Sequence, residues 1–383
     1  MSQTSTRLVA GIVIGLIIGA GIGYLVKPVP PPGPEWVSKA DYDALKASAA
    51  ANLTDALAEN ARLKSTLHTL GEGKRIGLIV ATGGLGDKSF NDISYAGVQR
   101  AKEELGIEFD YVEPKAIAEY LGYQTDFARS GKYALIIGIG FDQADALNVT
   151  AAAYPNQNFA IVDMVVSQPN VASLLFKANE GSFLVGVIAG MTTKTGKVGF
   201  VGGMDIDLIR DFFVGYKAGV LWANPSVTVL DPVYVGSWSD VVRGKELALS
   251  LADLGADGIY GAGGKGTLGA LEAVHERGIN GFGVDACQDY LYPEMLGSGI
   301  KRCDLAVYEM ILDAILGKFK GGIYTGGVKE GWTGNCRLPD EVKIWEDTFH
   351  FTHTPLPAAV IDKLVEARDK IISGEIKVPS GYG

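Results

Sequence analysis

Two acidic side chains stand where apolar strand-like runs end. Asp163 closes the run NFAIVD, and Asp285 closes the run GFGVD. A carboxylate flanked by buried strand residues is costly to desolvate unless it binds something. In parallel α/β sheets, ligands bind at the carboxyl ends of strands, where these acids would accept hydrogen bonds from vicinal hydroxyl groups.

Two aromatic side chains occupy similar places at the start of predicted helices. Phe90 and Asn91 follow a glycine-rich turn after the first strand, and Trp238 lies in VGSWSD. Ser89 with Asp92 has the spacing of a helix cap, which leaves Phe90 and Asn91 without a role. Two aromatic rings from different elements can sandwich a flat ring, each stacked pair contributing about 0.5–1.5 kcal/mol beyond area burial. A sugar joined to a planar base fits this set of groups.

The run GAGGKG at Gly261–Gly266 has the form of a dinucleotide-binding loop. It follows a strand and opens a helix, and Asp285 lies at the end of the next strand, where such proteins hold a ribose. A P-loop is excluded because Gly266 stands where Ser or Thr is required. Glycines at a strand-to-helix turn can also serve only to allow a tight turn and close packing of the backbone. A dinucleotide-binding oxidoreductase therefore stays an alternative.

Other catalytic or metal-binding patterns are weak in this sequence. His350 and His353 form HFTH, but no cysteine or acidic cluster adjoins them in the sequence, so we predict no metal site. No nucleophile elbow or zincin helix occurs. The net charge of -10, without a long basic run, argues against nucleic acid as a partner. We predict a binding protein that is not an enzyme and needs no cofactor.

The elements that must position these residues alternate along residues 73–383. Apolar strands separated by amphipathic helices indicate parallel sheets covered on both faces. Strands are predicted at 75–82, 109–112, 134–140, 158–163, 197–203, 227–235, 258–261 and 281–285. Helices are predicted at 91–105, 180–193, 209–223, 239–254, 267–277, 304–316 and 356–372. We expect two doubly wound α/β lobes, one of about 73–178 plus part of the C-terminal region and one of about 195–310, with a ligand between them.

The N-terminal part is predicted to attach this module to a membrane. Residues 8–26 carry no charge and are long enough to span the hydrocarbon layer, leaving a cytoplasmic tail of 1–7. A proline-rich linker, 27–37, and a helical stalk, 38–72, follow. The glycine stripe of the anchor and a heptad in the stalk would allow self-association. A sensor ectodomain is a further alternative, although it would need a separate cytoplasmic partner.

Several blocks in order resemble one protein family. They are GDKSFND, FKANEGSFLVGVIAG, VGFVGGMDIDLIRDFFVGYKAG, GSWSD with GKELA, and GVD followed by IKRCDLAVYEMI. The chain looks like the basic membrane protein (BMP, PnrA-like) family of solute-binding proteins of ABC importers. The resemblance implies a type I periplasmic-binding-protein fold with a three-segment hinge, an ABC permease as partner, and a purine nucleoside as ligand.

The resemblance also assigns roles to residues. It implies that Phe90 and Trp238 stack on the base, and that Asn91 contacts the base edge or holds the turn. It implies that Asp163, Asp285 and Lys301 bind the ribose hydroxyls. The further residues expected at the cleft are Ser89, Phe212 and Gly263.

Two departures from the family pattern concern specificity. Ala81 stands where the family commonly has an Asp that recognises the purine edge, and Cys287 replaces an acid. Another heteroaromatic ligand such as riboflavin is therefore an alternative. Cys287 and Cys303 either form a disulfide or remain two separate buried thiols.

Overall fold

The structure is a computed structural model that describes residues 39–382. The predicted tail 1–7, anchor 8–26 and linker 27–37 lie outside the described residues. Among the helices that are described, none is long and apolar enough to cross a membrane.

Helix α3 (Lys39–Gly71) precedes the α/β module and forms a separate unit from it. Leu57 and Leu70 are about half exposed on this helix. The apolar side chains of this helix do not gather on one face. Self-association through this stalk stays a prediction.

The first lobe contains a parallel sheet of six strands. Its order is β12-β5-β4-β3-β1-β2. The strands are β1 (Arg75–Ile79), β2 (Glu108–Val112), β3 (Leu135–Ile139), β4 (Phe159–Val162), β5 (Val171–Phe176) and β12 (Gly322–Gly326). Strands β1, β3 and β4 are almost entirely buried, as expected for a parallel sheet with helices on both faces.

The second lobe repeats this order in a second sheet. Its order is β13-β11-β10-β9-β6-β7, with β8 also paired to β6, and only β13 runs antiparallel to its neighbour. The strands are β6 (Lys197–Gly202), β7 (Thr228–Val229), β8 (Val233–Tyr234), β9 (Gly258–Ala262), β10 (Asn280–Asp285), β11 (Met295–Lys301) and β13 (Thr333–Asn335). When each sheet is read from its β2 or β7 edge and its strands are numbered within the lobe, both sheets start with the strand order 2-1-3-4-5 of doubly wound folds.

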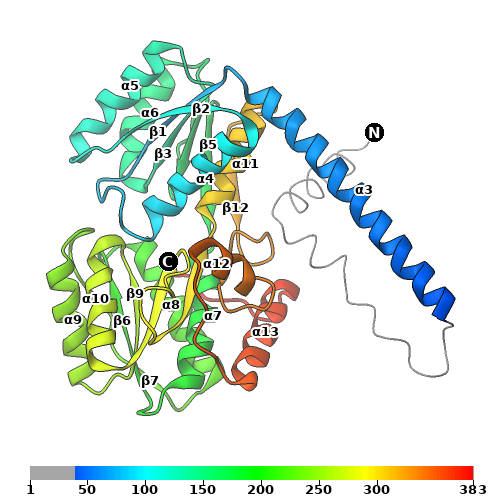
Figure 1. Ribbon diagram of the computed structural model, residues 1–383. Helices are drawn as coiled ribbons and strands as arrows, with labels where there is room; N and C mark the ends of the chain where they lie inside the picture. The colour runs from blue at the N-terminus through cyan, green and yellow to red at the C-terminus, as the bar shows by residue number, and fades with distance from the viewer. Residues whose placement is uncertain (1–38, 383) are drawn as a thin grey trace. The chain divides into compact units, whose positions relative to one another are not determined.

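Helices cover the sheets of both lobes (Figure 1). Those of the first lobe are α4 (Phe90–Leu105), α5 (Tyr120–Ser130), α6 (Ala144–Ala153) and α11 (Cys303–Ile315). Those of the second are α7 (Ala178–Thr192), α8 (Asp207–Ala223), α9 (Val241–Asp253), α10 (Gly264–Arg277) and α13 (Ala358–Ser373), and α12 (Val342–Phe349) precedes α13. The buried face of α13 joins the core of the second lobe.

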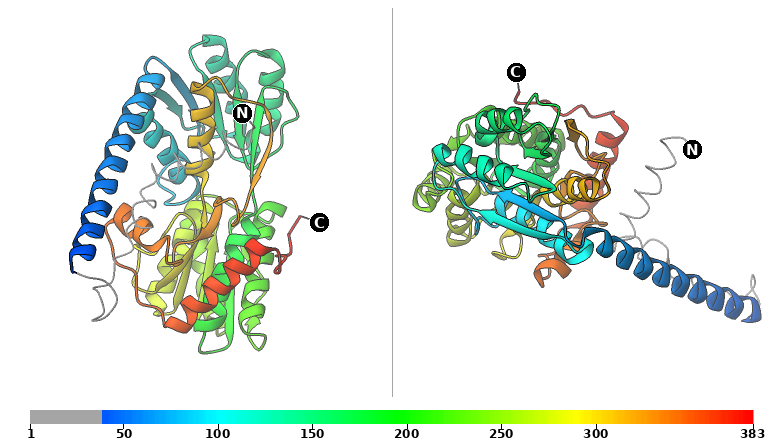
Figure 2. Two further views of the ribbon diagram at one scale, coloured as in Figure 1. Left: turned by 90° about the vertical axis from the view of Figure 1, so that its right-hand side faces the viewer. Right: turned by 90° about the horizontal axis from the view of Figure 1, so that it is seen from above.

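The chain passes between the lobes three times. It crosses from β5 to α7, returns from β11 to α11, and crosses again from β12 to β13. The crossings lie together between the sheets, as the two views of Figure 2 show with Figure 1. Three crossing segments allow one lobe to rotate against the other without unfolding either.

The predicted fold class is largely found, with differences at particular elements. The predicted strand 227–235 is divided into β7 and β8, because Asp231-Pro232 interrupts it and proline cannot donate to a ladder. Strands β5, β11, β12 and β13 and helices α5, α6 and α12 were not predicted.

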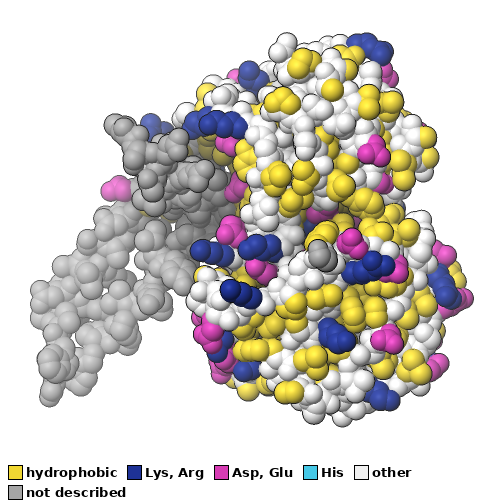
Figure 3. Space-filling model, turned by 180° about the vertical axis from the view of Figure 1, so that it is seen from behind, with side chains coloured by type: hydrophobic (Ala, Val, Ile, Leu, Met, Phe, Trp, Pro, Cys, Tyr) yellow, Lys and Arg dark blue, Asp and Glu magenta, His cyan; other side chains and the backbone are white. Residues whose placement is uncertain are grey.

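On the face in Figure 3, acidic and basic side chains are interspersed over both lobes.

Candidate functional site

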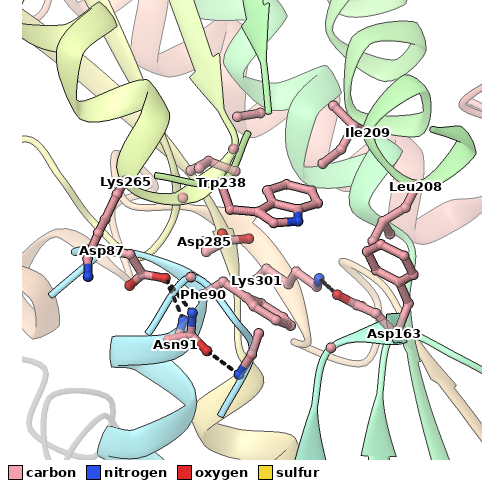
Figure 4. Close-up of a pocket in the computed structure, with 18 of the residues that line it drawn as sticks. Asp87, Phe90, Asn91, Asp163, Leu208, Ile209, Trp238, Lys265, Asp285 and Lys301 are labelled. Atoms are coloured by element: carbon pink, nitrogen blue, oxygen red, sulfur yellow. Dashed lines mark hydrogen bonds and ion pairs between the residues drawn. The ribbon is translucent and has the colours of Figure 1, made fainter. Parts of the chain in front are cut away.

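A cleft of about 660 Å³, including its solvent-open part, lies at the carboxyl ends of both sheets. Eight of the nine predicted site residues line it, and Ser89 lies directly behind it. The eight are Phe90, Asn91, Asp163, Phe212, Trp238, Gly263, Asp285 and Lys301. Most of them are labelled in Figure 4.

Asp163 and Asp285 occupy equivalent places in the two lobes. Asp163 follows β4 and Asp285 ends β10, and each strand is the fourth from the β2 or β7 edge of its sheet. Both residues have left-handed backbones, with φ of 71° and 65°. This conformation is uncommon for residues other than glycine and recurs at functional sites. In each lobe, a strained backbone conformation therefore places one carboxylate in the cleft.

The Asp285 carboxylate is only half satisfied. The Ser89 hydroxyl donates to Asp285 Oδ2 at 2.5 Å, whereas the buried Oδ1 has no hydrogen-bond partner among the described residues. Burial raises the pKa of Asp285 to about 6, although the Lys301 ammonium and the Ser89 hydroxyl oppose the shift. A buried acceptor without a donor is costly, and a ligand hydroxyl would satisfy it.

Lys301 is a buried cation at the floor of the cleft. Its ammonium group, with a side chain only 3% exposed, forms an ion pair with Asp163. The rings of Phe90 and Phe176 lie 4.7 and 5.1 Å from Nζ. Burial alone would lower the pKa of Lys301, but the Asp163 and Asp285 carboxylates outweigh it and raise the pKa above its usual value. The cation therefore stays charged and can donate to a polar ligand group.

Phe90 and Trp238 approach the cleft from the two lobes (Figure 4). Phe90 is the first residue of α4, and Trp238 lies between β8 and α9. The Gly266 N–H at the start of α10 donates to the Trp238 carbonyl at 3.1 Å, which fixes the backbone that carries the indole. The Phe141 ring meets the indole edge-on, with centroids 6.3 Å apart.

Asn91 holds the turn that precedes α4. Its Oδ1 accepts from the Ala81 N–H at 2.9 Å, and its Nδ2 donates to Asp87 Oδ2 at 3.2 Å. The buried Asp87 also accepts the N–H groups of Ser89 and Asn91, so Asp87 caps the helix. The alternative in which the Ser89 side chain caps the helix is not found, because its hydroxyl reaches across to Asp285 instead.

The glycines of the run 261–266 serve close packing. A Cβ at Gly263 would lie 2.3 Å from the Gly203 nitrogen, and one at Gly266 would lie 3.0 Å from the Ser237 carbonyl oxygen. The Gly266 N–H, which a pyrophosphate would need, is bonded to Trp238. This geometry disfavours the dinucleotide alternative.

Asp142 is a cleft residue that the sequence analysis missed. It lies in the 3-10 turn Phe141–Gln143 after β3, and its Oδ2 accepts from the Tyr120 hydroxyl at 3.1 Å. Its buried Oδ1 has no partner among the residues that the structure describes. Burial raises the pKa of Asp142, opposed by the Tyr120 hydrogen bond. The sequence GFDQ did not indicate a site residue, because Asp142 lies three residues beyond the end of β3.

The cysteines do not pair as one alternative proposed. Cys287, Cys303 and Cys336 are all free and buried. Cys287 lies beside Cys336 and His353, so the proposed Cys287–Cys303 disulfide is wrong. The second alternative, buried thiols, holds for this pair.

Two α/β lobes, three crossing segments and a cleft with charged and aromatic walls define a solute-binding protein of the type I periplasmic-binding class. The comparisons with known proteins name the family. Residues 74–381 match the family described as ABC transporter substrate-binding protein, PnrA-like. The chain belongs to this family of solute-binding proteins.

Its relatives agree with that assignment. The chain is 32% identical over 329 residues to the ABC transporter nucleoside-binding protein BmpA of Lactococcus lactis, covering 79% of this chain and 88% of the relative. An uncharacterized lipoprotein of Pyrococcus furiosus is 36% identical over 287 residues, 70% and 72% of the two chains. The solved structure of an ABC transporter solute-binding protein from Aeropyrum pernix K1 has a TM-score of 0.69 at 33% identity, covering 80% of this chain and 94% of the other.

Proposed function

We propose that this ABC transporter substrate-binding protein captures a purine nucleoside in its cleft. The observation that supports the proposal most is the unpartnered Asp285 Oδ1, which lies near the Lys301–Asp163 pair between two aromatic walls. The 2′ and 3′ hydroxyls of a ribose would donate to the carboxylates and accept from the ammonium. Phe90 and Trp238 would stack on the base.

Asp142 is the proposed reader of the base edge. The family's acid is absent at Ala81, but Asp142 lies close by: a Cβ built on Gly140 would be 3.1 Å from Asp142 Oδ1, 3.2 Å from Ala81 Cβ and 3.8 Å from a Phe90 ring carbon. The unpartnered oxygen, the vacated position and the stacking ring therefore all border Gly140. A carboxylate there accepts from an amino or ring N–H group of the base.

The proposed setting is the outer face of a cell membrane. Residues 8–26 would anchor the chain, the helix α3 would hold the binding module away from the bilayer, and an ABC permease would receive the ligand. Relatives in Pyrococcus carry the name lipoprotein, which is consistent with membrane attachment of such binding proteins.

Isothermal titration calorimetry with a ligand panel tests the proposal. The panel contains adenosine, guanosine, inosine, the free bases, riboflavin and NAD. We expect saturable binding of at least one purine nucleoside and much weaker binding of its free base. Asp285→Asn should weaken nucleoside binding about 10- to 100-fold, the value of one hydrogen bond to a charged group. Binding of riboflavin or NAD with no nucleoside binding would overturn the assignment.

A further inference from the structure

A second cluster of reactive side chains lies behind the cleft, outside the ligand site. Cys287 and Asp289 follow strand β10, Cys336 follows β13, and His353 lies between α12 and α13. Their potential ligand atoms all lie within 4.8 Å of one another, and all four side chains are buried. Two thiols, an imidazole and a carboxylate are ligands that Zn²⁺ accepts in tetrahedral sites.

Two distances inside the cluster are already those of a zinc site, and the others are at most 4.8 Å. Cys287 Sγ and His353 Nε2 are 3.5 Å apart, and His353 Nε2 and Asp289 Oδ2 are 3.6 Å apart. Tetrahedral bonds of about 2.3 Å to sulfur and about 2.0–2.1 Å to nitrogen or oxygen put neighbouring ligand atoms about 3.3–3.8 Å apart. An ion could therefore enter with small side-chain adjustments.

The atoms around the cluster point its ligands inward. Glu346 Oε1 lies 3.1 Å from His353 Nδ1, and this contact leaves Nε2 directed at the cysteines. Ser298 supports two further ligands, because its hydroxyl donates to Asp289 Oδ1 at 2.7 Å and its N–H donates to Cys336 Sγ at 3.3 Å. A carboxylate behind a histidine and hydrogen bonds to the other ligands are the usual outer shell of a metal site.

One buried ligand atom of the cluster accepts no hydrogen bond from the described residues. Asp289 Oδ2 has no hydrogen bond among the described residues, and its side chain is only 1% exposed. Arg337 Nη1 is the nearest guanidinium atom, 3.7 Å away. With two thiolates, one carboxylate, Zn²⁺ and the Arg337 cation, the buried group carries no net charge. Burial of a charged set is tolerable only when it is paired in this way.

A disulfide between Cys287 and Cys336 would account for fewer of the buried side chains in this cluster than a zinc ion would. It would use the two sulfur atoms and leave His353 Nε2 and Asp289 Oδ2 without a role. The thiols also exclude Mg²⁺ and Ca²⁺, which prefer oxygen ligands.

We propose that Cys287, Asp289, Cys336 and His353 form a structural zinc site. The site ties the segment after α12 to the turn that carries Asp285, two residues before Cys287.

The sequence alone pointed away from this site. His353 was paired with His350 as HFTH and judged to lack cysteine or acidic neighbours. The fold supplies those neighbours from residues far along the chain, whereas His350 is not among the four. The prediction of no metal site rested on sequence proximity, which the topology overrides.

Metal analysis of the full chain tests the proposal. The protein is produced without a polyhistidine tag in zinc-containing medium, dialysed under reducing conditions, and measured by plasma mass spectrometry. We expect about one zinc ion per chain. Cys336→Ser and His353→Ala should each lose the ion, whereas Cys303→Ser, a matched change at the buried cysteine outside the cluster, should keep it.

Two further measurements keep the test independent of folding failure. Cobalt substitution of the wild-type chain should give the thiolate charge-transfer absorption and strong visible bands of tetrahedral Co²⁺. Glu346→Gln, which keeps all four ligands, should weaken zinc binding about 10- to 100-fold. Wild-type chain that neither contains nor takes up zinc, or that shows a Cys287–Cys336 disulfide by peptide mapping of protein prepared without reductant, overturns the proposal. Nucleoside binding by the same sample is scored separately.

Discussion

At the scale of single residues, the site consists of polar atoms that the protein leaves unsatisfied. The Oδ1 atoms of Asp142 and Asp285 are both buried without a partner among the described residues, although each Oδ2 accepts a hydrogen bond. Folding alone would not favour such atoms, because each costs about 1–3 kcal/mol. In the proposed complex, Asp142 would accept from the base and Asp285 from the sugar.

Asp142→Asn tests the reading of the base edge. The amide replaces an acceptor that faces the base with a group of mixed polarity, so adenosine or inosine binding should weaken about tenfold or more. Purine riboside, which lacks an amino or N1–H donor, should lose little. Calorimetry on both ligands measures the difference. Equal losses for both would show that Asp142 acts only through the Tyr120 and Thr82 contacts.

Trp238→Ala tests the aromatic wall of the second lobe. Loss of the indole removes one stacked pair and its buried area, so nucleoside binding should weaken about 10-fold or more. The ring lies in the cleft and is partly buried against the core of the second lobe, so the unfolding midpoint should fall while the protein stays folded. Trp345→Phe, in α12 away from the cleft, is the control for tryptophan replacement and should bind normally.

At the scale of elements, close packing of α9 against α10 positions Trp238. A Cβ at Gly244 would lie 1.8 Å from the Gly266 carbonyl oxygen, so the helices can approach only through glycine. Gly244→Ala should therefore destabilise the protein by about 1–3 kcal/mol in urea unfolding and weaken ligand binding as well. Gly122→Ala in α5, with nothing within 4 Å, should instead stabilise it by about 0.5–1 kcal/mol. Matching effects of the two changes would contradict this role of the packing.

Helix α11 carries a carboxyl group whose ionisation opposes folding. Burial raises the pKa of Glu309 to about 7 from 4.5, while a hydrogen bond from Trp332 opposes the shift. Between pH 4.5 and 7 the folded chain retains a proton that the unfolded chain has lost, so the free energy of unfolding falls as pH rises through this window. The limit of this loss is about 3 kcal/mol.

Glu309→Gln should remove that pH dependence. The variant should match the wild type near pH 4.5 and be more stable above pH 7, as measured by chemical denaturation across the range. Glu246→Gln, at an exposed pair with Arg243, serves as the control and should change stability by less than about 0.5 kcal/mol. A Glu309→Gln curve parallel to the wild type would show that the carboxyl group titrates normally.

The sequence predicts helices and strands better than it predicts which residues of distant segments come into contact. Strands β1, β3, β4, β6, β9 and β10 were visible as apolar runs, and so were the aspartates that follow β4 and β10. Lys301 looks like a surface lysine by itself and is recognised only through the family resemblance, because burial depends on β11, which was not predicted. Asp142 was missed because it does not directly follow its strand, and Cys336 because its neighbours come from distant segments.

At the scale of the whole binding module, the two lobes are joined by polar bonds across the cleft as well as by the crossing segments. Ser89 of the first lobe donates to Asp285 of the second, and Gln288 donates to the Lys88 carbonyl at 3.1 Å. Lys301 and Asp163 form a third bond at the floor. A ligand that touches both lobes would add to these bonds and shift the molecule further toward the closed arrangement.

Ser89→Ala should shift that balance toward an open molecule. Without the hydroxyl, the buried Asp285 carboxylate loses its one donor, and the bond across the cleft is lost. We expect a larger radius of gyration in small-angle X-ray scattering of the protein freed of ligand, and the wild-type value once nucleoside saturates the site. Ser94→Ala is the matched control, because the Ser94 hydroxyl donates to the Phe90 carbonyl within the same helix. If both variants scatter like the wild type without ligand, the bonds across the cleft do not set the opening, and the crossing segments must do so.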